Sequence, residues 1–338
     1  MSRWAQDPEA AADALILRCL DDIAVAGRVL LAGPSRALPS AVRQRGAECA
    51  IWSRRLGEGA TAAPWLPPGP FDLAFVRLPK ARDEQVMTAH AALAALRPEG
   101  RIVLYGGNDE GIRPAVDLLK QLAGDVTTLA VRGHGRVLAA RRLESASGLR
   151  GPLAAWRAVS RLEIAGRTYD WVSYPGCFAA GRVDEGTALL LSVLPPLTAG
   201  ARVLDYGCGT GAIAAALLAR HPDLKIDAMD NDTVALVALG ENVPSAHPIL
   251  GLRVADAGRC RYEAILSNPP LHHGIAEDRT ALERLANDAP THLAPGGHLQ
   301  LVVQRRVPLD RLLGRQLAKV ETVAETGRYR VWRAQAAT

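Results

Sequence analysis

Short apolar segments of strand length alternate with helix-forming segments along the chain. In the second half, the β-prone residues Val203 and Leu204 precede a strongly helix-forming run from Ala212 to Ala219, and another apolar segment covers Ala264 to Leu266. The stretch from Val183 to Leu194 predicts a further helix with acidic residues in its first turn. Strands that alternate with helices in this way are typical of α/β proteins built on a parallel sheet.

The two halves of the sequence correspond in four places and in the same order. Segments at residues 27–39, 71–81, 96–107 and 126–142 resemble segments at residues 201–214, 262–272, 293–303 and 320–335. We therefore predict an internal duplication that gives two tandem Rossmann-like domains, each α/β and doubly wound. The first domain is expected to be degenerate, because it lacks the acid, most of the glycines and the Asn-Pro-Pro of the second. The expected boundaries are 1–145 for the first domain, 146–170 for a connecting segment and 171–338 for the second domain.

A glycine-rich turn follows the first apolar segment of the second half. Gly207, Gly209 and Gly211 separate the expected strand from the expected helix, and Asp205 stands at the strand end. Glycine permits positive φ and lets a ligand approach the backbone, while the helix N-terminus offers free N–H groups. The spacing D-x-G-x-G-x-G differs from the dinucleotide fingerprint, and the acid disfavours a pyrophosphate. The sulfonium and ammonium groups of S-adenosylmethionine fit this loop better than NAD does, and Cys208 is interpreted as a small filler.

Two further acidic residues are expected at strand ends. Asp230 closes the segment KIDAMD, about 25 residues after Asp205, where a carboxylate can accept hydrogen bonds from both hydroxyls of a ribose. The segment LRVADA predicts a third strand that ends at Asp256, which could accept a hydrogen bond from an adenine amino group. Asn231 and Ala257 follow these acids and are expected to share in cofactor binding. The alternative for either acid is a solvated loop carboxylate.

A rigid loop, Ser267 to Gly274, follows the apolar segment Ala264 to Leu266. Pro269 and Pro270 fix φ and remove two backbone donors, so the loop presents mainly acceptors, foremost the side-chain oxygen of Asn268. A planar exocyclic amine is a poor nucleophile, and acceptors on its N–H bonds favour positive charge developing on the nitrogen. The order of the two loops predicts methyl transfer to a planar nitrogen. His272 and His273 could accept the departing proton, or be solvated loop residues.

These motifs resemble the class I S-adenosylmethionine-dependent methyltransferases, and most closely the bacterial ribosomal RNA guanine-N2 methyltransferases of the RsmC/RlmG kind. The segments that carry the resemblance are VLDYGCGTG, ILSNPPLHHG, Tyr174 to Leu191 and Thr326 to Ala334. The resemblance implies two methyltransferase domains, a glycine loop and acids that bind the cofactor, and catalysis by Asn268, Pro269, Pro270 and Leu271. It also implies that Phe178 helps to close the site and that Asn268 lies beside the cofactor. Leu271 departs from the family, which usually has a base-stacking aromatic residue there.

The composition narrows the class of protein further. The chain of 338 residues carries a formal net charge of +5 and contains no apolar run of membrane-span length. Its N-terminus lacks a basic-then-apolar signal pattern and predicts an amphipathic helix. The five cysteines are scattered without a C-x-x-C pair, which indicates neither a disulfide framework nor a zinc site. We expect a cytoplasmic monomer without a metal ion.

Basic residues concentrate at the end of the first half. Residues 1–150 hold 20 Lys and Arg against 16 Asp and Glu, whereas the remainder holds 20 against 19. The arginines beginning with Arg132, Arg136, Arg141 and Arg142 suit phosphate contacts, so we expect the first domain to dock RNA. The family resemblance implies that this RNA is the 16S ribosomal RNA of the small subunit. The alternative is an ordinary solvated face or a basic linker.

Three functions remain open at this stage. The first is methylation of a guanine N2 in ribosomal RNA. The second is methylation of adenine N6 or of a protein glutamine, reactions that also use Asn-Pro-Pro loops. The third is a catalytically silent RNA-binding or ribosome-assembly factor, against which the intact glycine loop of the second copy argues.

Overall fold

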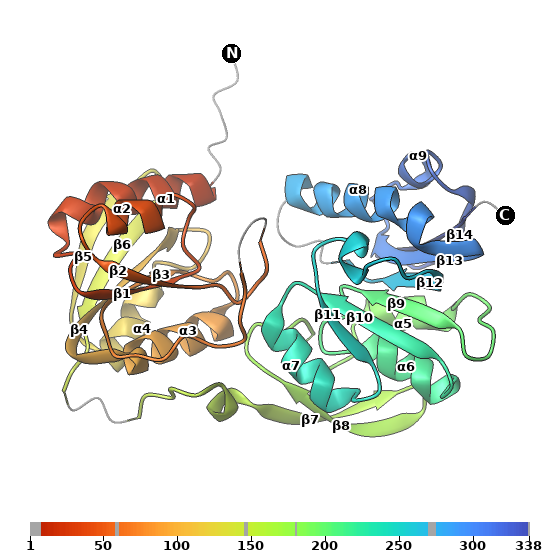
Figure 1. Cartoon of the computed structure of the whole chain (residues 1–338), viewed down its shortest axis with the longest axis horizontal. Helices are drawn as coiled ribbons and strands as arrows, with labels where there is room; N and C mark the ends of the chain where they lie inside the picture. Colours follow the sequence, from red (N-terminus) through yellow and green to blue (C-terminus); the bar gives the residue numbers. More distant parts are fainter. Residues whose placement is uncertain (1–7, 58–60, 145–147, 180, 270–274, 337–338) are drawn as a thin grey trace, which may run out of the picture. The chain divides into compact units, whose positions relative to one another are not determined.

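The computed structural model describes residues 8–57, 61–144, 148–179, 181–269 and 275–336 (Figure 1). The chain forms two compact units. The first unit comprises Met1–Arg54 and Gly59–Arg157, and the second comprises Arg55–Glu58 and Ala158–Thr338. The change from one unit to the other at residue 157 falls inside the expected connecting segment, and a short segment of the first half belongs to the second unit.

The first unit contains a six-stranded sheet in the order β2-β1-β3-β4-β6-β5. The strands from β1 to β4 are parallel, and β6 runs antiparallel to both β4 and β5. The strand bounds are β1 (Arg28–Ala32), β2 (Glu48–Trp52), β3 (Phe71–Arg77), β4 (Leu96–Gly107), β5 (Gly124–Arg132) and β6 (Gly135–Arg141).

Helices cover both faces of this sheet because its central strands are apolar on both sides. Val29 and Leu31 of β1 pack in the same cluster as the first two helices, while Leu30 packs in the same cluster as the next two. The helices are α1 (Pro8–Cys19), α2 (Leu38–Arg43), α3 (Arg82–Ala95) and α4 (Ala115–Leu122), with short 3₁₀ turns η1 (Leu20–Asp22) and η2 (Leu153–Trp156). The expected N-terminal helix corresponds to α1, whose Ile16 is fully buried in the same cluster as apolar residues of the sheet.

The second unit repeats this plan with one more strand, in the order β11-β10-β9-β12-β13-β15-β14. The parallel strands are β9 (Arg202–Tyr206), β10 (Lys225–Asp230), β11 (His247–Leu250), β12 (Tyr262–Ser267) and β13 (Leu293–Gln304). The antiparallel strands are β14 (Ala318–Glu325) and β15 (Tyr329–Gln335).

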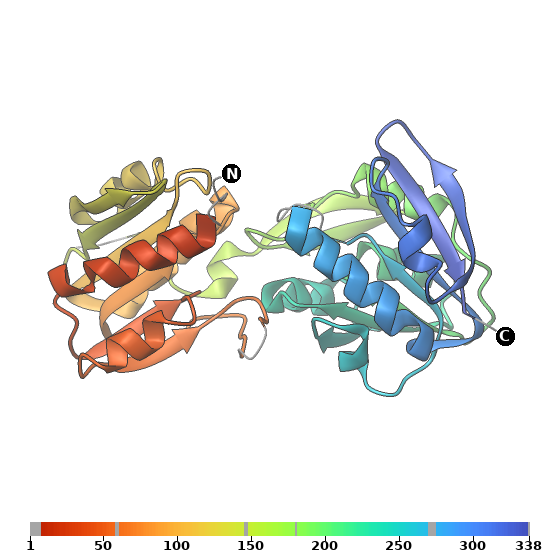
Figure 2. The ribbon, with the colours of Figure 1, turned by 90° about the horizontal axis from the view of Figure 1, so that it is seen from above.

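One face of the second sheet is covered by α5 (Glu185–Ser192), α6 (Ala212–Arg220) and α7 (Thr233–Asn242), whose apolar residues pack with Val203 and Leu266. The other face is covered by α8 (Ile275–His292) and α9 (Asp310–Leu313), which pack with Leu204 and Ile265. Figure 2 looks onto the faces that α1 and α8 cover in their respective units. Both sheets are thus doubly wound, which confirms the predicted fold class of two tandem Rossmann-like domains.

The two sheets agree residue by residue in register. In the first unit Leu31 lies opposite Phe75, and in the second unit Asp205 lies opposite Leu266. Following the same register, Arg77 at the end of β3 occupies the position that Asn268 occupies after β12. This agreement supports the predicted duplication at the level of backbone pairing.

A two-stranded hairpin completes the second unit. Strands β7 (Ala158–Ile164) and β8 (Arg167–Ser173) pair antiparallel, and Trp171 is buried in the same cluster as apolar residues of α6 and α7. The Trp171 indole donates to the hydroxyl of Thr210, which lies in the glycine loop, at 3.0 Å. The hairpin therefore belongs to the second unit and contacts its glycine loop through Trp171.

One expected strand is wrong. The strand before Asp256 ends at Leu250, and Asp256 lies in the 3₁₀ turn η3 (Val254–Ala257). One oxygen of Asp256 accepts from the backbone N–H groups of Leu252 and Arg253 at 2.7 and 2.9 Å. The carboxylate stabilises a local turn because an acidic side chain can satisfy N–H groups that no strand partner takes.

Candidate functional site

The glycine turn adopts the backbone that its sequence predicts. Gly207, Gly209 and Gly211 have φ values of 73°, 53° and 99°, and α6 begins directly afterwards. A Cβ at Gly209 would meet no atom within 4 Å, whereas one at Gly211 would lie 2.6 Å from Leu239. Gly209 therefore borders open space that a ligand can enter, and Gly211 is required for helix packing.

Asp205 is fully buried at the end of β9. Its Oδ2 accepts from the backbone N–H of Ala214 at 3.1 Å, while its buried Oδ1 has no hydrogen-bond partner among the described residues. Burial raises the pKa of this carboxyl to about 7, against the lowering effect of the Ala214 N–H, and the charge of Asp230 raises it further. A buried acceptor left open in this way can receive a hydrogen bond from a ligand.

Asp230 ties the glycine loop to the end of β10. Its Oδ2 accepts from the Gly209 N–H at 2.8 Å and its Oδ1 from the Asp232 N–H at 2.9 Å. Burial, and then the charge of Asp232, raise the pKa of Asp230. Asp232 in turn caps α7 and pairs with Arg55 at 3.0 Å, and the N–H of Leu56 donates to the Asn231 carbonyl at 2.8 Å.

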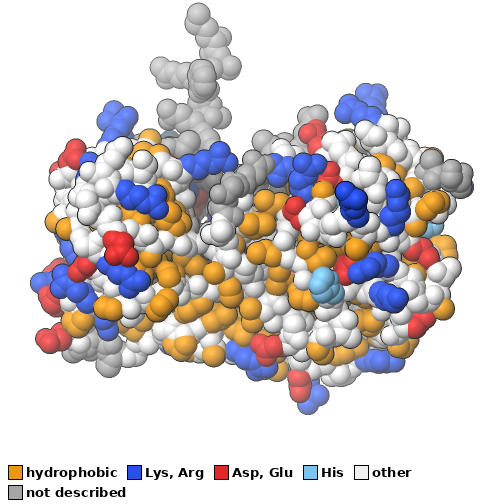
Figure 3. Space-filling model, in the orientation of Figure 1, with side chains coloured by type: hydrophobic (Ala, Val, Ile, Leu, Met, Phe, Trp, Pro, Cys, Tyr) orange, Lys and Arg blue, Asp and Glu red, His pale blue; other side chains and the backbone are white. Residues whose placement is uncertain are grey.

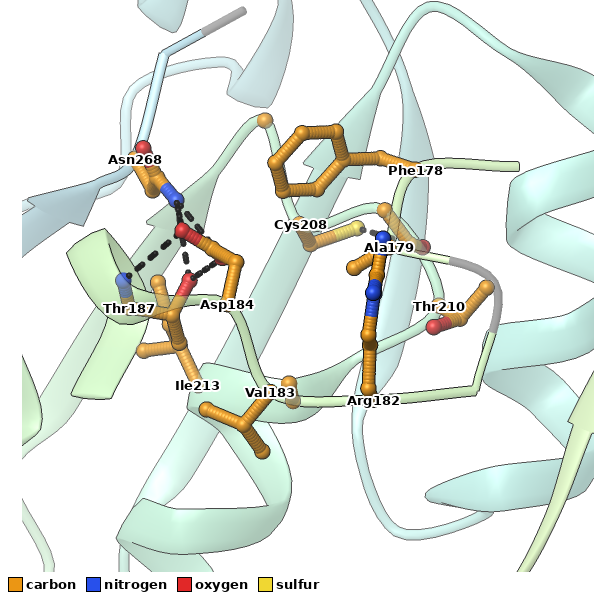
Figure 4. A pocket seen from close by; sticks show the side chains of 13 residues that line it. Phe178, Ala179, Arg182, Val183, Asp184, Thr187, Cys208, Thr210, Ile213 and Asn268 are labelled. Atoms are coloured by element: carbon orange, nitrogen blue, oxygen red, sulfur yellow. Dashed lines mark hydrogen bonds between the residues drawn. The ribbon is translucent and has the colours of Figure 1, made fainter. Parts of the chain in front are cut away.

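Asn268 follows β12 and holds its amide in a fixed network. Its Nδ2 lies 3.1 and 3.3 Å from the two oxygens of Asp184 and 2.9 Å from the hydroxyl of Thr187 (Figure 4). Asp184 is the N-cap of α5, and Thr187 lies in the first turn of that helix. The amide nitrogen of Asn268 is therefore committed to α5, and its oxygen points away from Asp184.

The glycine loop and Asn268 border one pocket in the second unit. It is lined by parts of the PGCF stretch, the start of α5, the glycine loop and the end of β12: Phe178, Ala179, Arg182, Val183, Asp184, Thr187, Gly207, Cys208, Gly209, Thr210, Ala212, Ile213 and Asn268. Phe178 is 46% exposed at this pocket. The pocket lies beyond the carboxyl ends of β9 and β12, where the strand order reverses, and ligands of open α/β sheets bind at such a point.

Five of the residues proposed from sequence line this pocket: Phe178, Gly207, Cys208, Gly209 and Asn268. Others stand behind the lining or outside it: Asp205, Gly211, Asp230, Asn231, Asp256 and Ala257. Pro269 is buried next to Asn268, whereas Pro270, Leu271, His272 and His273 lie outside the described residues. Burial raises the pKa of the Cys208 thiol, so it stays protonated and acts as a small filler.

The sequence does not identify Asp184 and Thr187 as residues of the site, although both line the pocket. In the sequence, Asp184 belongs to an acidic helix start, which is a common capping signal, and Thr187 is a neutral residue of the same turn. Their role at the pocket depends on a contact with Asn268 across 84 and 81 residues, which local patterns do not contain. Among the described residues, no group of three or more His, Cys, Asp or Glu side chains could hold a metal ion, and no helix has the length and apolarity of a membrane span.

Comparison with known families agrees with this geometry. The family model described as "Methyltransferase small domain" matches residues 168–333, and the model described as "Methyltransferase small domain N-terminal" matches residues 15–144. Fold and site thus define a class I methyltransferase domain that follows a related N-terminal domain. Relatives named "Ribosomal RNA small subunit methyltransferase C" are 31–36% identical over 77–80% of this chain, so the chain belongs to that family.

Individual relatives cover most of the chain. The protein of that name from Pseudomonas aeruginosa (strain LESB58) is 36% identical over 277 residues, which is 80% of each chain. Its counterpart from Hahella chejuensis (strain KCTC 2396) is 29% identical over 92% of this chain and 94% of its own. A solved structure, the T. thermophilus 16S rRNA N2 G1207 methyltransferase (RsmC) in complex with AdoMet and guanosine, superposes with a TM-score of 0.84 at 24% identity, over 99% of this chain and 93% of that one. This superposition supports the two-domain fold.

The raised pKa of Asp205 can be tested by measuring how protein stability depends on pH. Folding raises the pKa of Asp205 from an ordinary value of about 3.9 to about 7, so ionisation of this carboxyl opposes folding. The free energy of unfolding therefore falls as the pH rises from about 4 to about 7. Asp205→Asn removes this dependence. Relative to the wild type, the variant should gain up to about 1.4 kcal/mol for each pH unit between pH 5 and 7 in urea unfolding. Parallel pH profiles of the two proteins would contradict the raised pKa.

Proposed function

We propose that the protein methylates the exocyclic N2 of a guanine in 16S ribosomal RNA, with S-adenosylmethionine as methyl donor. One observation carries the proposal: the side-chain oxygen of Asn268 is held at the same strand ends as the glycine loop. The amide N–H groups of Asn268 already donate to Asp184 and Thr187, which leaves the oxygen as the group that can accept from a substrate. The family membership and the names of the relatives support the substrate. A ribosomal substrate would be met in the cytoplasm.

The second unit fits this cofactor by its chemistry. The open space at Gly209, the unpartnered buried oxygen of Asp205 and the carboxylate of Asp230 suit a ligand with cationic and hydroxyl groups. When bound, S-adenosylmethionine supplies an electrophilic methyl group on sulfur. The chain's own contribution is to orient the amine: Asn268 accepts one N–H, which directs the nitrogen lone pair and favours the positive charge that develops on it.

We propose that the cofactor binds in the second unit alone. In the first unit the position of Asp205 is taken by Leu31, a fully buried apolar residue. The position of Asn268 is taken by Arg77, whose guanidinium makes two 2.8 Å bonds to Glu110. A large side chain locked in an ion pair occupies the strand ends there, which supports a degenerate first domain.

We further propose that the first unit contributes RNA affinity through the hairpin of β5 and β6. Arg132 and Arg136 flank the turn of this hairpin, and Arg132 is exposed without an ion pair in the described part of the chain. Arg141 instead pairs with Glu99 and Asp125, and Arg142 donates to the Leu96 carbonyl. On the face drawn in Figure 3, basic side chains are interspersed with acidic ones. Because Arg141 and Arg142 already have these partners, Arg132 and Arg136 are the stronger candidates for contacts with RNA.

The function is tested on small ribosomal subunits from cells that lack this protein, incubated with it and labelled S-adenosylmethionine. Digestion to nucleosides should yield labelled N2-methylguanosine. Label in N6-methyladenosine or in a protein glutamine would replace the proposed substrate with the corresponding alternative, and no label above background in RNA or protein would favour the silent factor.

A side chain at Gly209 should block cofactor binding. Gly209→Val introduces atoms where the pocket is open, and we expect S-adenosylmethionine affinity to fall more than about tenfold, or roughly 1.4 kcal/mol, in calorimetry. Gly200→Val is the matched control, because Gly200 also has positive φ and open space but lies before β9, away from the pocket. Similar affinities of the two variants, or two binding sites per chain in the wild type, would contradict a single site at this loop.

Asn268 should act in the chemical step rather than in cofactor binding. Asn268→Ala removes one preoriented acceptor, and turnover should fall about 10²–10³-fold while the dissociation constant of the cofactor stays within about twofold. Single-turnover rates at saturating RNA, with calorimetry on the same preparation, measure both quantities. Turnover close to that of the wild type would remove Asn268 from the mechanism.

The hairpin arginines should control the salt dependence of RNA binding. Replacing Arg132 and Arg136 with alanine should weaken RNA binding and lower the slope of log affinity against log salt by up to about 0.7–0.9 for each lost phosphate contact. Arg141→Ala is the matched control, because that arginine already pairs with two carboxylates. If the double variant keeps the wild-type affinity and slope at two salt concentrations, the hairpin does not dock RNA.

A further inference from the structure

The start of α5 carries the carboxylate of Asp184, whose Oδ1 caps the helix and lies 3.3 Å from the Asn268 amide nitrogen, while its Oδ2 takes no part in backbone capping. Oδ1 of Asp184 accepts from the backbone N–H groups of Gly186 and Thr187 at 2.9 and 3.2 Å, which is ordinary capping of a helix. Oδ2 accepts from the Thr187 hydroxyl at 2.5 Å and lies 3.1 Å from the Asn268 amide nitrogen. Capping alone needs only the first oxygen, so the second is available to the pocket.

The network leaves Asn268 a single orientation. A carboxylate only accepts hydrogen bonds, and the one proton of the Thr187 hydroxyl points to Asp184, so the hydroxyl offers Asn268 its lone pairs. Both partners therefore require the nitrogen end of the amide. A flipped Asn268 would place its oxygen against two acceptors, which is repulsive.

We infer that Asp184 and Thr187 are positioning residues for methyl transfer: they fix the Asn268 amide so that its oxygen accepts from the target amine. This inference rests on the proposed function. The negative charge of Asp184 also polarises the amide through its N–H groups, which makes the Asn268 oxygen a stronger acceptor as positive charge develops on the amine. Asp184 and Thr187 act through Asn268 and need not touch the substrate.

The second capped helix of this unit provides a comparison. Asp232 caps α7 through one oxygen, which accepts from Val234 and Ala235, and its other oxygen pairs with Arg55. The capping chemistry is the same, yet the second oxygen of Asp232 meets a cation rather than a side-chain amide. The contact of Asp184 with Asn268 is thus an addition to capping and can be removed separately from it.

Substitutions at the two positions separate these roles. Asp184→Ser and Asp184→Asn both retain good capping residues, but serine is too short to reach Asn268 and asparagine lacks the charge. Both should lower kcat about 10–100-fold, while the cofactor dissociation constant, KM for the RNA and the melting temperature change little. Thr187→Val should lower kcat similarly, and Thr187→Ser, which keeps the hydroxyl, should restore most of that loss. Ser192→Ala, at the exposed end of the same helix, is the control and should leave kcat unchanged.

A double-mutant cycle with Asn268→Ala decides the matter. If Asp184 acts through Asn268, adding Asp184→Asn to Asn268→Ala should cause no further loss of kcat. Losses that multiply, or a loss of kcat matched by equal losses of cofactor affinity and melting temperature, would overturn the inference. An inactive wild type, or an Asn268→Ala variant with wild-type turnover, would instead overturn the proposed function. The two failures are distinguishable, because the inference fails only when the wild type is active, Asn268→Ala is impaired, and the Asp184 variants do not behave as predicted.

Discussion

The register between β9 and β12 is the constraint on which the site depends. Asp205 lies opposite Leu266 and Tyr206 opposite Ser267, so the glycine loop and Asn268 leave the sheet side by side. The buried hydroxyl of Ser267 donates to the Tyr206 carbonyl at 2.8 Å, one residue before both loops begin. A shift of one residue would turn every side chain of β12 to the opposite face, and the acceptor would no longer border the loop.

The same strand register in the first unit does not produce an equivalent site, because the two side chains at the strand ends differ. With Leu31 in place of the acid, the strand end offers a ligand no charge, and with Arg77 in place of the amide it offers a donor instead of an acceptor. Arg77 then needs a carboxylate of its own, and Glu110 supplies it with both side chains largely buried. Breaking such a pair would leave an uncompensated buried charge, so replacing either Arg77 or Glu110 alone is disfavoured.

The sequence was sufficient to predict structural features that depend on neighbouring residues along the chain. Alternating apolar and helix-forming segments predicted both sheets, and the glycine spacing predicted positive φ where Gly207, Gly209 and Gly211 have it. It failed at Asp256, because an acid that caps a turn and an acid that ends a strand look alike when neighbouring residues are apolar. It also could not reveal the Asp184 contact, since two residues 84 apart meet only after the sheet and α5 have packed.

The charges of the second unit explain which part of a nucleotide its pocket can receive. Asp184, Asp205 and Asp230 bring carboxylates to one end of the sheet in a chain whose net charge is +5. Arg182 adds an exposed positive charge to the pocket lining. A phosphate would be repelled by the carboxylates, whereas a cationic cofactor and an uncharged base would not. Under the proposed function, the base would leave its stack to enter this pocket, and surfaces outside the pocket would hold the RNA backbone. Affinity for RNA would then be separate from chemistry on the base.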